Sequence, residues 1–314
     1  LAEFCKKNKI LSVGLSDTSN LCGALEFSEN ISKSGTQPII GTQINFSYGG
    51  EIGLLPIIAK NNDGYKNIME LSSKSYLDND GMSENHCNLD DLLKINKELI
   101  VLSGSINGLV GKLFNKGKFN EINQIYKLFK ENYKNDFYIE IQRHGDLNEV
   151  GFERYNLNKS KELDIPIIAT NEVYYLEKEM HEAHDALICI GNKTYINEKN
   201  RIKFSDNHYL KSDNEMKELF SDLPEALINN YNITFKCNFR PQASKPVLPN
   251  ISSEKGGNAD EILIQDSLEG LKEKFLSVFK LKDVELASNP IFLKYKDRLD
   301  HEIKIIVKMN YSSY

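Results

Sequence analysis

Apolar runs and helix-like stretches alternate along the first 180 residues of the chain. Residues 10–15 form an apolar run with the length and branching of a buried strand, and residues 21–34 have a helical pattern. A second apolar run begins at 38–41. A strand, a helix and a strand in this order imply a parallel pair, because the chain must cross back over the sheet before the second strand.

The same alternation continues as far as the sixth strand. It favours an α/β barrel or an open doubly wound sheet over an all-α or sandwich fold. Beyond residue 178 the pattern changes to helices and loops. The second strand is expected to continue through 43–46, and further strands are expected at 53–59, 98–104, 136–142 and 165–170. Helices are expected at 65–76, 89–95, 117–133, 149–163, 182–190, 213–220 and 224–237.

The C-terminal part of the sequence predicts a second domain. Prolines at 246 and 249 favour an extended linker, because each proline disfavours helix at the residue before it. Two long amphipathic helices are expected at 259–279 and 291–309, and their many lysines are typical of solvated faces rather than of DNA contacts. The predicted organisation is a first domain at 1–244, a linker at 245–258 and the start of another domain at 259–314.

Composition and charge narrow the class of protein. The formal charge of −6 over 314 residues argues that the average surface does not grip nucleic acid, although it leaves room for a local basic face. Five scattered cysteines without a C-x-x-C pair favour reduced thiols in the cytoplasm. No apolar run approaches the length of a membrane span. The first and last residues read as the interior of domains, so we expect a fragment at both ends.

Polar residues at strand ends are the first candidates for a site, because the C-terminal ends of parallel strands line the sites of α/β folds. These residues are Asp17, Gln43, His144 and Glu172, and only two of them are good metal ligands by type and position. Asp17 could equally cap the following helix, and a lone histidine after a strand is more often structural. Glu140 is expected to face water.

Two further motifs are weak. His181 and His184 are three residues apart, whereas the metalloprotease helix needs two histidines four apart with a glutamate directly after the first. The three glycines within 104–111 lack the spacing of either nucleotide-binding fingerprint and favour a turn into a helix.

Several stretches, in order along more than 290 residues, resemble one family. They are 17–41 with its T-S-N-L-C-G and K-S-G-T-Q-P-I-I-G segments, 61–67, 102–104, 138–145, 166–175, 184–191, 210–227 and 295–314. Together they are similar to the N-terminal PHP domain and the opening of the palm in the α subunits of bacterial DNA polymerase III. The resemblance implies a PHP-type distorted α/β barrel, here without its first strand, followed by the beginning of a helical palm segment.

The resemblance also implies that the metal site of the family has decayed. Metal-holding PHP domains use His-x-His on the first strand, a later Asp-His, a Glu, further histidines and a final Asp-x-His. Asp17, His144 and Glu172 stand at such positions and could still bind, but they are too few for a cluster of divalent ions. We therefore expect no bound metal and no other cofactor in this segment. The replaced positions are Thr18, Gln43, Leu54 and Tyr174.

The implied function is that of the N-terminal part of a replicative DNA polymerase catalytic subunit in the cytoplasm. In this family Mg²⁺ and the palm aspartates that hold it lie beyond residue 314, so the segment alone is expected not to polymerise DNA. It would serve as a scaffold that docks the proofreading exonuclease and other replicase subunits, with DNA bound through other regions. The alternatives are a metal-dependent PHP-family phosphoesterase and, third, an unrelated α/β-barrel enzyme.

Overall fold

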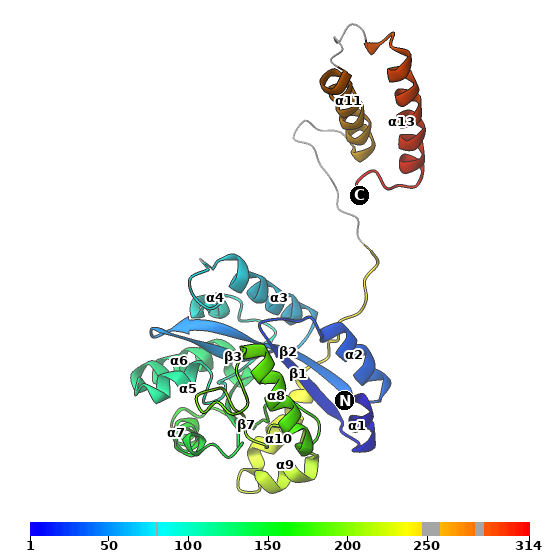
Figure 1. The fold of residues 1–314 in the computed structure, drawn as a ribbon. Coiled ribbons are helices and arrows are strands. Elements are labelled where there is room, and N and C mark those ends of the chain that lie inside the picture. Colours follow the sequence, from blue (N-terminus) through cyan, green and yellow to red (C-terminus); the bar gives the residue numbers. More distant parts are fainter. Residues whose placement is uncertain (80, 247–257, 280–285) are drawn as a thin grey trace. The chain divides into compact units, whose positions relative to one another are not determined.

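The computed structural model describes residues 1–79, 81–246, 258–279 and 286–314 (Figure 1). The chain divides into two compact units, Leu1–Ala243 and Ser244–Tyr314. Most of the predicted linker at 245–258 lies outside the described residues. The assignment of 1–244 and 259–314 as functional domains stays a prediction.

The described strands of the first unit form one sheet. Its order is β1-β2-β3-β5-β6-β7, and the two-residue β4 pairs with β2. β1 and β2 are parallel, as the sequence predicts, and so are the pairs β5–β6 and β6–β7, whereas β3 is antiparallel to both of its neighbours. The strands are β1 (Ser12–Thr18), β2 (Gln37–Tyr48), β3 (Glu51–Ala59), β4 (Cys87–Asn88), β5 (Leu99–Leu102), β6 (Phe137–Ile141) and β7 (Ile167–Ala169).

Helices connect the strands and cover the sheet. In Figure 1, α3 and α4 lie on one side of the long strands β2 and β3, while α9 and α10 lie near β7. They are α1 (Ala2–Lys7), α2 (Ala24–Lys33), α3 (Asn62–Leu77), α4 (Leu89–Lys94), α5 (Leu109–Asn115), α6 (Phe119–Tyr133), α7 (Leu147–Leu163), α8 (His181–Asn192), α9 (Asp213–Leu219) and α10 (Pro224–Lys236), with short 3₁₀ turns at Lys134–Asp136 and Lys178–Met180.

The predicted mixed α/β architecture is confirmed, with one local correction. β1 continues through Asp17 to Thr18, and α2 begins only at Ala24 with no side-chain cap. The helix-cap role considered for Asp17 is therefore wrong. Asn20 makes the local turn instead, since its Oδ1 accepts a hydrogen bond from the Cys22 backbone N–H at 3.0 Å.

Side chains alternate between the two faces of the sheet and divide the core. On β6, Ile139 and Ile141 belong to the larger cluster beneath α3 and α6, whereas Tyr138 belongs to a smaller cluster on the opposite face. This alternation follows from the period of two along a strand. Glu140, which lies between Ile139 and Ile141 on β6, therefore points to the face of the smaller cluster.

The described residues of the second unit include the helices α11 (Ala259–Phe279) and α13 (Pro290–Lys308), at the positions predicted from the sequence. They pack around Phe275 and Phe292, whose ring centroids lie 5.3 Å apart, and Leu286 completes this core. Asn289 caps α13 by accepting hydrogen bonds from the backbone N–H groups of Ile291 and Phe292. No helix in the described ranges is long and apolar enough to cross a membrane.

Candidate functional site

A cavity of about 660 Å³ opens on the inner face of the sheet. Six strands, from β1 to β7 without β4, contribute to its lining, so the sheet curls around it as in a partly closed barrel. We call this space the mouth cavity. The cavity is lined by polar residues of the strands and by residues that follow β7 and α8, including Asn171, Glu172 and Lys211.

Glu140 lies at the floor of the mouth cavity, and the expectation that it faces water is wrong. Only 4% of the residue is exposed. Its Oε1 accepts hydrogen bonds from Gln142 Nε2 at 3.0 Å and from the Thr170 hydroxyl, but its Oε2 has no hydrogen-bond partner among the described residues. Burial raises the pKa of the Glu140 carboxyl, although the Thr170 and Gln142 hydrogen bonds act to lower it.

Asp17 and Gln43 stand on neighbouring strands of the same cavity. Asp17 pairs with Thr42 in the parallel register of β1 and β2, and the Thr42 hydroxyl donates to the Asp17 carbonyl at 2.7 Å. Gln43 donates from Nε2 to the carbonyl of Ser16 at 3.4 Å. A Cβ atom at Gly23 would lie 3.3 Å from Asp17 Oδ2, so glycine leaves room for this carboxylate.

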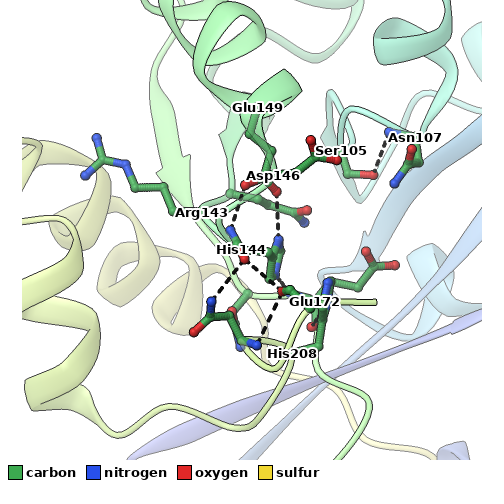
Figure 2. Close-up of polar contacts among 12 residues, drawn as sticks. Ser105, Asn107, Arg143, His144, Asp146, Glu149, Glu172 and His208 are labelled. Atoms are coloured by element: carbon green, nitrogen blue, oxygen red, sulfur yellow. Dashed lines mark hydrogen bonds and ion pairs between the residues drawn. The ribbon is translucent and has the colours of Figure 1, made fainter. Parts of the chain in front are cut away.

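His144 is buried behind the mouth cavity rather than in its lining, and only 3% of it is exposed. Nδ1 lies 2.9 Å from Glu149 Oε1, and Nε2 accepts the backbone N–H of Glu172 at 3.2 Å. The neutral tautomer with the proton on Nδ1 satisfies both contacts, so we assign that tautomer. Figure 2 shows the ring between these two partners.

Glu149 holds His144 through the backbone as well as the ring. Its Oε2 accepts the His144 backbone N–H at 2.7 Å. Burial acts to raise the pKa of Glu149, but the hydrogen bonds from the His144 ring and backbone outweigh it and lower that pKa. Glu149 is the third residue of α7, whose N-cap Asp146 accepts from Asn148 N–H at 2.9 Å. An acidic side chain in this first turn also suits the helix dipole.

His208 stacks on His144, with ring centroids 4.0 Å apart and planes 4° from parallel. Its Nδ1 donates to the carbonyl of Glu172 at 2.9 Å. Burial and the nearby His144 lower the pKa of His208 to about 4. His208 is therefore neutral at pH 7, and the two stacked rings brace the backbone of Glu172 from two sides (Figure 2).

The other residues at positions expected for the metal site lie in different surroundings. Glu172 lines the mouth cavity, and its Oε1 accepts the hydroxyl of Tyr174 at 2.7 Å. Burial and the Glu172 carboxylate raise the pKa of Tyr174. Thr18, exposed at the end of β1, also lines the cavity. Leu54 is on the same face of β3 as Pro56 and Ile58 but lies beyond the lining.

These positions do not fit a metal cluster. Both ring nitrogens of His144 already serve neighbouring protein groups, and Tyr174 occupies an oxygen of Glu172. Leu54 offers no donor atom at all. Within the part of the chain that the structure describes, no group of three or more His, Cys, Asp and Glu side chains could hold a metal ion, and this includes His181 and His184 on α8. We therefore derive no chemistry through a metal here.

Sequence reasoning missed several residues of this site. Gln142 and Thr170 both donate hydrogen bonds to Glu140. Lys211 Nζ donates to Asn171 Oδ1 at 2.9 Å. Burial lowers the pKa of Lys211. The alternation of Glu140 and Gln142 with Ile139 and Ile141 was a usable signal. The spacing of residues in the sequence gives no sign that Lys211 lies near the residues that follow β7.

Comparisons with known proteins agree with this fold and place it in a family. Residues 1–144 match the model of the PHP domain. The whole chain is 36% identical to the DNA polymerase III subunit alpha of Rickettsia conorii over 319 residues, which are 27% of that protein. It is 34% identical to the subunit of Caulobacter vibrioides, and 96% of it matches that of Vibrio cholerae at 33% identity.

Residues 1–144 of the first unit are thus similar to a PHP domain, in agreement with the resemblance described above. More particularly, the chain is related along its length to DNA polymerase III α subunits, as its motifs predicted. It spans about a quarter of the length of the curated relatives that it matches.

Proposed function

We propose that this chain is the N-terminal part of the catalytic α subunit of a bacterial replicative DNA polymerase, located in the cytoplasm. Its similarity over its full length to subunits of that name carries the proposal. In this proposal the palm aspartates and their Mg²⁺ belong to regions outside these 314 residues, so the purified chain is expected not to extend a primer. The second unit would begin the palm.

The first unit serves in this proposal as a metal-free scaffold. The engagement of both His144 nitrogens supports that role, because a metal would have to displace Glu149 or the Glu172 N–H. The competing function is that of a metal-dependent PHP-family phosphoesterase. It requires Asp17, His144 and Glu172 to rearrange around an ion.

Metal analysis of the purified chain distinguishes the two functions. After incubation with Zn²⁺ or Mn²⁺ and gel filtration, we expect far less than one ion per chain and no phosphatase activity. Stoichiometric metal, with phosphatase activity lost in both Asp17→Asn and His144→Ala, would overturn the scaffold. Circular dichroism of each variant separates loss of a ligand from loss of the fold.

The scaffold is also proposed to dock the proofreading exonuclease and other replicase subunits. An exposed apolar face on α10 supports a protein contact: Ile228, Tyr231 and Phe235 are 59%, 53% and 72% exposed and lie at i, i+3 and i+7. The exonuclease subunit of the same genome is expected to coelute with the chain, and Phe235→Asp to prevent this. Leu147→Asp, at another exposed apolar position, is the matched control and should coelute. Equal coelution of both variants would place the contact elsewhere.

A further inference from the structure

A second concave surface of the first unit lies at the start of β2, away from the mouth cavity. It is a groove of about 690 Å³ between the beginning of β2, the first turns of α3 and the segment that follows α10. We call it the basic groove, because Lys66 and Arg240 line it and no Asp or Glu does. The chain as a whole carries a formal charge of −6, so this surface has the opposite sign to the average.

Two aromatic rings form the apolar part of the basic groove. Tyr65 of α3 and Phe239 have ring centroids 5.0 Å apart with planes tilted by 35°. Met69, 41% exposed, adds a third apolar side chain. A base can stack on a ring of this kind whatever its identity, because every base has a π face.

The wall that carries Phe239 and Arg240 is held in place by the rest of the unit. The backbone N–H of Asn238 donates to the Lys60 carbonyl at 2.8 Å. Gln37 Nε2 donates to the Cys237 carbonyl at 2.6 Å, and the Ser28 hydroxyl to the Pro241 carbonyl at 3.4 Å. The groove is therefore formed before any ligand arrives, which limits the ordering cost of binding.

Apart from Gln37, whose amide holds the wall, the polar side chains of the basic groove are exposed and mostly uncommitted. Within the described ranges, the guanidinium of Arg240 makes no hydrogen bond or ion pair, and the side-chain amides of Asn62, Asn238 and Gln242 make no hydrogen bond. Lys66 pairs only with Asp63, at 3.6 Å, and its side chain is 62% exposed. An exposed pair of this kind stabilises little, so Lys66 can turn to a ligand.

We propose that the basic groove binds a single strand of nucleic acid, with one nucleotide seated between the aromatic pair and the two cations. The rings of Tyr65 and Phe239 stack on the base, Arg240 and Lys66 contact the phosphates, and the free amides meet the polar edges of the base. A duplex does not fit this chemistry, because its bases are already stacked. The proposal goes beyond the polymerase assignment and does not depend on metal in the mouth cavity.

Fluorescence anisotropy of a labelled single-stranded dT oligonucleotide with the full chain tests this proposal. Phe239→Leu keeps the apolar volume and is expected to weaken binding by about 5- to 150-fold, the range for losing one stacked base. Two phosphate contacts give log K against log salt a slope of about −1.4, which Arg240→Gln should reduce to about −0.7. Tyr65→Phe keeps the ring and should bind like the wild type.

Controls make the outcomes distinct. Lys199→Gln removes an exposed positive charge outside the groove and is expected to leave binding unchanged. Equal losses in Lys199→Gln and Arg240→Gln would overturn the proposal in favour of general charge attraction. A duplex that binds as tightly as the single strand, dTMP that binds as tightly as the oligonucleotide, or unchanged binding in Phe239→Leu would overturn it as well.

Discussion

The two concave surfaces of the first unit use polar side chains in opposite ways. Around the mouth cavity several of them are engaged with one another: Glu172 with Tyr174, His144 with Glu149, and Lys211 with Asn171. In the basic groove, Arg240 and the amides of Asn62, Asn238 and Gln242 have no such partners among the described residues. Engaged groups hold a fold together, whereas uncommitted groups on a preformed wall are available to a ligand.

Identical substitutions in the two regions should therefore differ, and the largest effect is expected at Arg143, next to the mouth. Its guanidinium contacts both oxygens of Glu153 and of Asp222 and the Leu219 carbonyl, and it lies 4.8 Å from the centroid of the Phe220 ring. Arg143→Gln leaves the mostly buried Glu153 carboxylate without its ion-pair partner. We expect a loss of about 3 kcal/mol in the free energy of unfolding.

Urea denaturation followed by circular dichroism measures this loss. Arg143→Lys is the matched variant, because it keeps the positive charge but cannot bridge four carboxylate oxygens at once. It should lose less than Arg143→Gln. A loss below about 0.5 kcal/mol in Arg143→Gln would mean that this end of α7 does not depend on the network.

The stacked histidines predict the next largest effect, which depends on pH. An unfolded histidine takes up a proton near pH 6.5, but folded His208 does so only near pH 4. Between these values the unfolded state binds more protons, so stability falls as the pH falls. From pH 7.5 to pH 5 this one group should remove about 2 kcal/mol. His184, whose pKa burial also lowers, acts in the same direction.

His208→Gln isolates that contribution. The difference in unfolding free energy between the wild type and the variant should shrink, or reverse in favour of the variant, as the pH falls from 7.5 to 5. The lowered pKa values of Glu149 and Asp222 make stability fall only at more acidic pH, below the window of the comparison. A difference that stays constant with pH would show that His208 titrates normally in the folded chain.

A smaller effect of opposite sign is expected at Glu140. Its folded pKa is raised, so the folded state keeps the proton longer than the unfolded state does. The stability associated with this group is full at acidic pH and is lost as the pH rises through the folded pKa. Glu140→Gln removes the buried charge and should be more stable than the wild type at pH 8.

The same unfolding experiments at pH 5 and pH 8 test Glu140. The advantage of Glu140→Gln should be smaller at pH 5 than at pH 8, because the raised pKa of the wild-type carboxyl favours its protonated form as the pH falls. A variant that is less stable at both pH values would mean that Oε2, unpartnered among the described residues, contributes a stabilising contact that the amide cannot replace.

Much of this architecture could be predicted from the sequence, because apolar runs and helical periods are local signals. The parallel β1–β2 pair and the helices at 259–279 and 291–309 are examples. Two errors at the site have one cause. Asp17 at the end of β1 and Glu140 within β6 are polar residues on strands, and a local pattern does not show that the sheet curls and encloses one face.

Contacts between distant segments could not be predicted from spacing. His208 stacks on His144 from 64 positions away in the numbering, and Phe239 meets Tyr65 across more than half of the first unit. The resemblance to a family predicted the positions of a decayed metal site but gave no reason to examine the basic groove. That surface depends on where the chain returns after α10.

The smallest effect is expected from Arg240→Gln, the counterpart of Arg143→Gln in the basic groove. Arg240 is exposed and makes no ion pair among the described residues, so its removal should change the unfolding free energy by less than about 0.5 kcal/mol. The substitution deletes the same charge as Arg143→Gln, and both variants can be measured in one urea series. A loss comparable to that of Arg143→Gln would mean that Arg240 is part of the architecture, and the distinction between engaged and uncommitted surfaces would fail.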